Sequence, residues 1–412
     1  MPARQVRPAT KIGLLALGVL LVAMLFLLSP KGGRLCTTVI RIAGPFTYVF
    51  LCDSPAFMRM AHDPGRLFDA TRLPNGRYVN NWQTRPLFVL TAAMIARPIL
   101  WIFGFAGHPY YAAFIAMNFV IVVLAVVLFD RLFAPHDRLV WPLLAVALPL
   151  VANDVVKERF WSPHTQMLNI LAPVVSMVLC RGVLTTRRSL TRHVLGSGLL
   201  AGALPLFYGI FFAVLPAMLL AVIWRTRDAR ALAPALALVL AFAAPTVAWA
   251  LVLRWNGGVF YSVEMTEFRQ FVWIVDAATA GSAMLAARVR TSVTPFLASL
   301  GPALWFPVTL LLLVAAWTVA HRLSLRETLR AERATVVAAT VTFASFAAFL
   351  WALGTYVPRL SFALVPPVLA VTAVLVTEAV RRTSIPSARR LVTSVGLSSV
   401  AYLVFEIATH GV

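Results

Sequence analysis

Acidic residues are scarce in this chain. Only 15 of its 412 residues are Asp or Glu, against 36 Lys and Arg, and only three of the basic residues are Lys. Charged residues make up 12% of the chain and apolar residues 60%, whereas soluble domains carry about 25% charged residues. This shortage of charge excludes an ordinary soluble globular protein. It also makes each carboxylate near a membrane surface a candidate for chemistry.

Long apolar runs take the place of the missing charge. They recur along the chain at about 20 residues each, the length that a helix needs to cross a bilayer core, and the mean hydropathy is +0.85. The first run, 12–29, follows Arg4, Arg7 and Lys11. It is longer than a signal-peptide core and no A-x-A-like cleavage site follows it. We therefore expect a retained first helix and an all-α polytopic membrane protein.

The excess of basic residues is concentrated in short clusters between apolar runs. Short loops rich in Lys and Arg stay on the cytoplasmic side of a membrane. The net charge of +21 is therefore predicted to reflect topology and contact with anionic lipid head groups, and no nucleic-acid partner is expected. The clusters lie at residues 181–192, 225–230, 322–333 and 381–390.

Placing these clusters in the cytoplasm predicts eleven transmembrane helices, with the amino terminus inside and the carboxyl terminus outside. We expect one domain, 1–412, with long outer loops at 30–111 and 254–296 and no separate soluble domain. The predicted spans are 12–29, 112–133, 139–153, 166–182, 193–207, 208–224, 231–253, 297–320, 333–352, 358–380 and 391–408.

One segment decides this topology. The apolar run 86–105 could cross the membrane, but Arg97-Pro98 interrupts it, and a crossing would place the later basic clusters outside. We therefore predict an interfacial helix in the first outer loop. The weaker run 38–51, which Arg41 and Gly44-Pro45 interrupt, is expected to form a second one.

Ionisable and sulfur-containing residues narrow the function further. Almost no ionisable residue lies in the middle of a predicted span, whereas transporters usually keep such residues in the membrane for coupling. Cys36 and Cys52 both lie in the first outer loop and form either a disulfide or small apolar contacts. No metal-ligand spacing occurs in the sequence, so no metal site is predicted.

Asp53 is the carboxylate that stands out, because it follows the first helix on the outer side. Ser54-Pro55 can begin a helix, whose dipole would favour the ionised form of Asp53. Such a carboxylate can act as a general base on a hydroxyl group. The alternative is that Asp53 only caps the helix, and the local sequence favours neither.

Basic and aromatic residues mark three further outer segments. In the second outer loop, Lys157, Arg159 and His164 either pair with neighbouring acids or face a phosphate, for which Arg suits bidentate contacts. The loop 254–296 has a mixture of residues that suits a cap over a lipid-linked substrate or any surface near head groups. Arg359 is a single Arg at the outer mouth of a span, where it could bind a phosphate. The candidates in the loop 254–296 include Glu264, Arg269 and Trp273.

Together these features resemble the GT-C superfamily, which comprises integral-membrane glycosyltransferases that use polyprenyl-phosphate sugars. The pattern D-S-x-x-[YF]-x-x-x-A is present after the first helix, an Arg-Pro-Leu sequence begins the interfacial helix, and a Pro-Pro pair follows Arg359. The residues that carry the resemblance are Asp53, Ser54, Phe57, Ala61, Arg85, Pro86, Leu87, His164, Thr165, Gln166, Asn169, Tyr356, Arg359, Pro366 and Pro367. Many members have a second acid in the second outer loop, where this chain has His164. The pattern is closest to actinobacterial mannosyl- or arabinosyltransferases.

The resemblance implies a GT-C-like fold and an inverting transfer of mannose or arabinose from a polyprenyl-phosphate donor. The acceptor would be a lipid-linked or cell-envelope glycan at the outer face of a bacterial inner membrane. Asp53 would be the general base, with no cofactor. The implied donor-phosphate ligands are Arg359, His164, Lys157, Arg159 and Arg269, and the implied substrate-binding residues are Trp82, Gln83, Arg85, Gln166, Asn169, Glu264 and Trp273.

Two alternatives stay open at the level of the sequence. A polysaccharide polymerase or ligase of another membrane fold would depend on Arg and His in its outer loops and would not need Asp53. A lipid or glycan transporter is disfavoured by the sparse intramembrane charge and by the lack of visible internal repeats. The sugar, the acceptor, the oligomeric state, any metal dependence and the roles of a second acid and His164 are not encoded in a recognisable motif.

Overall fold

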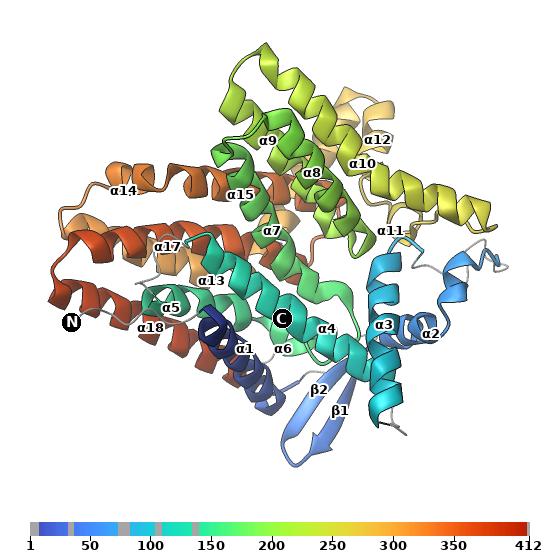
Figure 1. The fold of residues 1–412 in the computed structure, drawn as a ribbon, viewed down its shortest axis with the longest axis horizontal. Coiled ribbons are helices and arrows are strands. Elements are labelled where there is room, and N and C mark those ends of the chain that lie inside the picture. The colour runs from blue at the N-terminus through green and yellow to red at the C-terminus, as the bar shows by residue number, and fades with distance from the viewer. Residues whose placement is uncertain (1–7, 32–36, 73–82, 104–108, 134–139, 410–412) are drawn as a thin grey trace.

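The computed structural model describes residues 8–31, 37–72, 83–103, 109–133 and 140–409. Helices dominate these residues, and one pair of strands accompanies them (Figure 1). The α-helices are α1 Pro8–Leu25, α2 Ser54–His62, α3 Pro86–Phe103, α4 Pro109–Arg131, α5 Val140–Val151, α6 Asp154–Arg159, α7 Leu168–Thr185, α8 Leu190–Ala203, α9 Val214–Thr226, α10 Leu232–Trp255, α11 Val263–Thr266, α12 Val272–Thr279, α13 Ser282–Ala320, α14 Leu325–Ala331, α15 Arg333–Leu353, α16 Pro358–Ser361, α17 Val365–Arg382 and α18 Ile385–Ala408. Short 3₁₀ turns include η4 Thr165–Met167, η5 Leu204–Leu206 and η6 Gly209–Ala213.

Nine helical segments in the described part of the chain are long and apolar enough to cross a membrane. They correspond to nine of the eleven predicted spans, so the polytopic all-α fold is confirmed but the count of eleven is not. The other two predicted spans, 139–153 and 193–207, form the shorter helices α5, of 12 residues, and α8, of 14 residues. α5 stops at Val151 because Asn153 caps the next helix, accepting hydrogen bonds from the backbone of Val155 and Val156.

α17 lies at the centre of the helical bundle. In its apolar window 89% of the residues are buried, whereas the corresponding window of the peripheral α10 is 22% buried. α17 packs against α13, α15, α18 and α5, and α15 in turn packs against α7 and α9. The exposed side chains of α10 are mostly apolar, as expected of a surface that faces lipid.

α8 approaches α10 closely through two glycines. Gly198 and Gly202 are spaced as in a small-xxx-small pattern, which lets helix backbones come together in a membrane. A Cβ atom at Gly202 would lie 2.1 Å from the carbonyl oxygen of Phe242, and one at Gly198 would lie 3.1 Å from the Cβ of Ala241. The absence of a side chain at Gly202 is therefore a requirement of this helix crossing.

The segment 38–51 forms a β-hairpin, so the predicted interfacial helix is wrong. Strands β1 Thr37–Ala43 and β2 Phe46–Leu51 pair antiparallel, with Gly44 in the left-handed region at a φ of 52°. Both strands are rich in β-branched and aromatic residues, which favour extended backbone, and the glycine supplies the turn. Of the other interfacial prediction, 86–105, the described residues Pro86–Phe103 form the single helix α3, which packs against α4 and α2.

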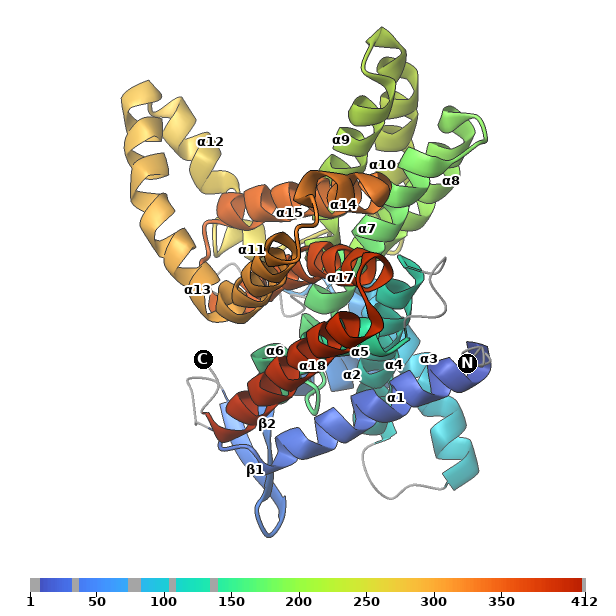
Figure 2. The ribbon, with the colours of Figure 1, turned by 90° about the vertical axis from the view of Figure 1, so that its left-hand side faces the viewer.

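Two groups of helices diverge from the centre of the bundle. α12 and the first part of the long helix α13 form one arm, and α8, α9 and α10 form the other, with α15 and α17 between them (Figure 2). The elements α2, α3 and α11 lie at one end of the molecule, whereas α14 lies at the other (Figure 1). The segments at or next to Asp53, Arg85 and Glu264 therefore lie at the same end of the molecule.

Candidate active site

A cavity of about 460 Å³ lies where α2, α11, α16 and the turns η4 and η6 meet. Its volume is within the range of about 300–1,000 Å³ that is usual for small-molecule sites. The polar and charged side chains that line it come from distant parts of the chain. They are Asp53, Thr84, Arg85, His164, Gln166, Tyr208, Thr246, Ser262, Glu264, Gln270, Thr355 and Arg359.

Asp53 is placed by the start of α2. It is the N-cap residue of this helix, and Pro55 follows within the first turn, where proline is favoured. The Asp53 side chain makes no capping hydrogen bond, and its carboxylate lines the cavity instead. The alternative that Asp53 serves only as a helix cap therefore fails.

His164 faces Asp53 from the segment between α6 and η4, the predicted second outer loop. Its Nε2 atom lies 3.6 Å from the Asp53 Oδ2 atom, and its side chain is 9% exposed, against 42% for Asp53. The imidazole ring packs edge-on against Phe57 of α2, with ring centroids 5.9 Å apart. The helix that begins beside Asp53 thus also holds the ring that faces its carboxylate.

A hydrogen bond between two buried serines joins the loops that carry this pair. The hydroxyls of Ser54 and Ser162 lie 2.9 Å apart, and the Ser162 hydroxyl accepts a hydrogen bond from the Leu51 backbone N–H at 3.1 Å. Asn118 of α4 donates from Nδ2 to the carbonyl oxygens of Phe160 and Ser162, each at 2.9 Å. These buried bonds fix the second outer loop against α2 and α4.

Electrostatics keep Asp53 ionised. The imidazole of His164, followed by the positive charges of Arg85 and Arg359, holds the pKa of Asp53 below its usual range, although partial burial acts in the opposite direction. Burial lowers the pKa of His164 to about 4, helped by the positive charges of Arg159 and Arg85 and opposed by Asp53. At neutral pH the pair is therefore a carboxylate beside a neutral imidazole.

Arg85 connects three parts of the cavity wall. Its guanidinium forms an ion pair with Glu264 of α11, donates to the Thr165 hydroxyl at 3.3 Å and lies 4.9 Å from the centroid of the Tyr208 ring. A guanidinium over an aromatic face is an attractive cation–π contact. Arg85 is therefore both buried and neutralised, and it ties the first outer loop to the loop after α10.

Arg359 is the charge of the cavity that lacks a counterion. Among the described residues it has no acidic side chain within ion-pair distance, whereas Arg85 is matched by Glu264. Its side chain is exposed, and its backbone carbonyl accepts a hydrogen bond from Asn169 at 3.5 Å. A cation in this state is available for an anionic group of a ligand.

One wall of the cavity is apolar and continues to the protein surface. Exposed aromatic and aliphatic side chains line it, including Phe212 at 43% and Phe268 at 64% exposure. Phe212 belongs to the turn η6, next to α9, a helix long enough to span the membrane together with that turn. The cavity therefore has a charged end at Asp53 and an apolar side next to spanning helices.

Two basic residues that the sequence assigned to a donor phosphate do not reach the cavity. The Lys157 ammonium is buried, donates to the carbonyl oxygens of Glu406, at 2.6 Å, and of Thr409, and lies 3.9 Å from Asp154. Arg159 pairs with Glu158 at 3.2 Å. α6 turns both side chains toward the protein interior, and neither is among the residues that line the cavity.

The remaining predicted residues surround the cavity at different depths. Arg269 pairs with Asp276, and the Trp273 indole donates to the Ala352 carbonyl at 2.9 Å. Both residues belong to the loop between α10 and α13, and neither lines the cavity.

The predicted substrate-binding amides differ in their position. Gln166 lines the cavity, and its Oε1 atom accepts a hydrogen bond from Asn169 at 2.5 Å. Gln83 is buried and donates to the Asp69 carbonyl at 2.7 Å. Trp82 and Cys36 lie outside the described residues, so the role of Trp82 and a Cys36–Cys52 disulfide stay predictions.

Sequence reasoning missed Tyr208. The Tyr208 ring lies under Arg85, and its hydroxyl accepts a hydrogen bond from Gln166 at 3.4 Å. Its position was visible in the sequence, because Tyr208-Gly209 stands at the junction of the predicted spans 193–207 and 208–224, where the chain must turn on the outer side.

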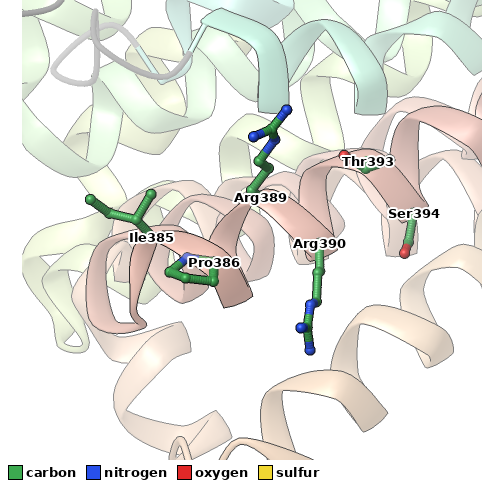
Figure 3. A pocket seen from close by; sticks show the side chains of 6 residues that line it. All are labelled: Ile385, Pro386, Arg389, Arg390, Thr393 and Ser394. Atoms are coloured by element: carbon green, nitrogen blue, oxygen red, sulfur yellow. The ribbon is translucent and has the colours of Figure 1, made fainter.

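A second hollow, of about 490 Å³, lies on α18 (Figure 3). All six residues that line it belong to this helix, and Arg389 and Arg390 extend away from one another. It contains no carboxylate or imidazole and no second element converges on it, so the cavity at Asp53 is the candidate active site. Within the described residues, no group of three or more His, Cys, Asp and Glu side chains could hold a metal ion.

The arrangement of the helices is a GT-C-like membrane fold, as the sequence predicted. The chain is similar to the solved structure of ArnT from Cupriavidus metallidurans bound to undecaprenyl phosphate. The TM-score is 0.52 at 15% sequence identity, and the match covers 96% of this chain and 64% of ArnT. The chain thus spans less than two thirds of the length of ArnT, and the likeness concerns the fold. No protein-family model and no curated protein sequence matches the chain.

Proposed function

We propose that this protein is a membrane glycosyltransferase that moves a sugar from a polyprenyl-phosphate donor to a hydroxyl group of a lipid-linked or cell-envelope glycan. The observation that carries the proposal is the position of the Asp53 carboxylate in a cavity that also holds the unmatched Arg359 and has an apolar wall. A polyprenyl-phosphate sugar has three parts of matching chemistry: a sugar, a phosphate and a hydrocarbon tail. The undecaprenyl phosphate bound to ArnT, a protein of similar fold, supports this class of ligand.

In the proposed reaction Asp53 is the general base. The acceptor hydroxyl attacks the anomeric carbon of the donor sugar and its proton passes to Asp53, while the bond between that carbon and the phosphate oxygen breaks. The product is an inverted glycoside, and polyprenyl phosphate leaves with the bonding electron pair. Because the pKa of Asp53 is held low, the carboxylate takes the proton late, after the attacking oxygen has gained positive charge.

Arg359 has the complementary role on the leaving group. Negative charge grows on the phosphate oxygen as the glycosidic bond breaks, and a fixed cation at that position stabilises the transition state. Arg85 is less suited to this role because Glu264 already neutralises it. Mannose and arabinose are the proposed sugars, the active site is proposed to face the outer side of a bacterial inner membrane, and the mechanism needs no cofactor.

A transfer assay with purified protein in lipid nanodiscs tests the proposal. Polyprenyl-phosphate-linked mannose, arabinose and glucose are each supplied with an extract of cell-envelope glycolipids, and both the glycosylated product and released polyprenyl phosphate are measured. We expect one of the sugars to be transferred and Asp53→Asn to abolish the transfer while the protein stays folded. Full transfer by Asp53→Asn would remove Asp53 from the mechanism and favour a polymerase or ligase of another type. No transfer and no binding of any of the three donors would contradict the proposal as a whole.

A further inference from the structure

The side chain that faces Asp53 offers an inference that rests on, and deepens, the proposed function. We propose that His164 is a positioning residue for Asp53: a neutral imidazole that donates its Nε2–H to the carboxylate, and not a ligand of the donor phosphate. The two atoms lie 3.6 Å apart, and hydrogen bonds of catalytic groups often tighten from such a distance when the substrate binds.

The orientation of the ring is fixed independently of any ligand. His164 is buried, its ring packs edge-on against Phe57, and the loop that carries it is held by the Ser54–Ser162 hydrogen bond. These contacts allow the imidazole little freedom to turn from Asp53 toward another group. The Nε2 atom therefore stays directed at the Oδ2 atom of the carboxylate.

The position of the proton follows from the surroundings of the two ring nitrogens. The Nδ1 atom is buried, and among the described residues it has no hydrogen-bond partner. A proton on Nδ1 would leave a buried N–H donor unsatisfied and turn the Nε2 lone pair toward a carboxylate. A proton on Nε2 avoids both penalties. The neutral tautomer with Nε2–H is therefore the one that fits.

Charge around the ring keeps the imidazole neutral. Arg159 and Arg85 both oppose a positive charge on His164, and burial acts in the same direction, while only Asp53 favours the protonated form. A neutral donor leaves Asp53 as a full anion. The imidazole N–H of His164 binds one carboxylate oxygen of Asp53. The other oxygen is left to accept the proton of the acceptor hydroxyl. His164 keeps its own proton throughout the transfer.

A phosphate-binding role would require a different arrangement. His164 would have to direct a donor or a positive charge into the cavity, but its Nε2 donor faces Asp53 and its Nδ1 atom is buried. Arg359 meets that requirement instead. The two roles make opposite predictions for the kinetics of a His164 variant.

The kinetic test uses the donor that supports transfer by the wild-type protein, with His164→Ala and His164→Gln. The alanine variant should lower kcat about 10- to 100-fold and leave the KM for the donor unchanged. Loss of the Nε2–H bond removes an interaction that favours the ionised carboxylate, so the acidic limb of the pH–rate profile should move to higher pH. The glutamine variant places an amide N–H near the former Nε2 atom and should restore part of kcat and of the limb position.

His62, the histidine of α2, supplies the matched control for the kinetic test. His62→Gln changes an exposed histidine at the end of α2, outside the cavity lining, and should alter neither parameter. A His164→Ala variant with normal kcat, an unmoved acidic limb and a raised donor KM would overturn the proposal and make His164 a phosphate ligand.

A second measurement does not depend on activity, so it separates failure of this inference from failure of the proposed function. Nitrogen-15 NMR of histidine-labelled protein, with His164→Gln used for assignment, should show His164 neutral and protonated on Nε2 at about pH 7. Asp53→Asn should shift the His164 signal, whereas Asp63→Asn should not. A positively charged imidazole, or a proton on Nδ1, would overturn the inference even if the protein proves to be a glycosyltransferase.

Discussion

The hydroxyls of Ser54 and Ser162 share a hydrogen bond of 2.9 Å, although the residues are 108 positions apart in the chain. Ser54 directly follows Asp53, and Ser162 stands two positions before His164. Both serines are fully buried. One bond between two small side chains therefore sets the position of the general base of the proposed reaction relative to the imidazole that faces it.

We expect Ser162→Ala to weaken both stability and transfer. The change removes the partner of the Ser54 hydroxyl and of the Leu51 N–H, and a buried polar group left without a partner costs about 1–3 kcal/mol. It also loosens the alignment of Asp53 with His164, so kcat should fall about tenfold or more. Thermal unfolding and the transfer assay measure the two effects.

The matched control for this serine is Ser176→Ala. Ser176 and Thr342 form a buried hydroxyl pair at the same 2.9 Å distance, but they join α7 to α15 away from the cavity. This control should lower the melting temperature without lowering kcat in the folded protein. If both variants affect kcat equally, the Ser54–Ser162 bond has no special part in aligning the site.

The pH dependence of transfer should have an acidic limb at unusually low pH. His164, Arg85 and Arg359 lower the pKa of Asp53, and the general base is active when ionised. Activity that depends on Asp53 is therefore retained as the pH falls and is lost only below the ordinary Asp pKa of about 3.9. Rates measured between about pH 4.5 and 8 should show no loss on the acidic side that is assignable to Asp53.

Two results would contradict this pH profile. An acidic limb in the wild-type protein at or above about pH 5 would show that the base is a group of higher pKa than Asp53. Removal of the nearby positive charge in Arg359→Gln should move the limb to higher pH, because a cation favours the carboxylate. A movement to lower pH would contradict the assignment of the charges around Asp53.

The spanning helices could be predicted from the sequence because each carries its own signal. An apolar run of sufficient length determines a span locally, and nine of the predicted spans are helices of spanning length in the described residues. The hairpin 37–51 was missed because the run was interpreted by its hydropathy. Its alternating β-branched and aromatic residues around Gly44-Pro45 indicate strands. This residue pattern agrees with the observed hairpin, whereas the hydropathy predicted an interfacial helix.

The candidate site was less predictable because its geometry depends on contacts between distant segments. Asp53, His164, Arg85 and Glu264 were each singled out, but nothing in the sequence paired Asp53 with His164 or Arg85 with Glu264. For Lys157 the difficulty was orientation. α6 has only six residues, which is too short for an apolar periodicity to show which face is buried, and the ammonium points to the carboxyl-terminal segment.

Arg359 is expected to act on the donor. Arg359→Ala should lower kcat/KM for the polyprenyl-phosphate sugar about 10- to 100-fold, through both a raised donor KM and a lowered kcat, because a hydrogen bond to a charged group contributes about 1.5–3 kcal/mol and this one strengthens as the phosphate leaves. It should leave the KM for the acceptor nearly unchanged. Arg359→Lys keeps the charge but loses bidentate contact, so it should be intermediate. Initial rates with each substrate varied in turn measure both constants.

Lys157 supplies the contrasting variant for Arg359. Its buried ammonium is bonded to carbonyl oxygens at the end of α18, so Lys157→Met should leave the donor KM unchanged. It should lower stability, because the carbonyl oxygens of Glu406 and Thr409 each lose a hydrogen bond from the ammonium and the nearby Asp154 loses a positive charge. A raised donor KM in the folded Lys157→Met protein would show that a basic residue outside the cavity contributes to donor binding.

The crossing of α8 and α10 provides a test of the fold next to the apolar wall of the cavity. Gly202→Ala would place a Cβ atom 2.1 Å from a backbone oxygen of Phe242, and backbone atoms cannot move aside as a flexible side chain can. The two helices must separate, and close packing is what stabilises helix pairs in a membrane. A loss of about 1–3 kcal/mol is expected, with a lower melting temperature in detergent.

Gly196→Ala is the control in the same helix. A Cβ atom at Gly196 has no neighbour within 4 Å, and replacing a helical glycine by alanine stabilises by about 0.5–1 kcal/mol. The two variants should therefore have effects of opposite sign. Because Thr246 of α10 lines the cavity, separation of α8 and α10 at Gly202 should also raise the donor KM, whereas Gly196→Ala should not. Equal effects of Gly202→Ala and Gly196→Ala on stability would contradict the close crossing. In that case the added methyl group at position 202 would not collide with the backbone of Phe242.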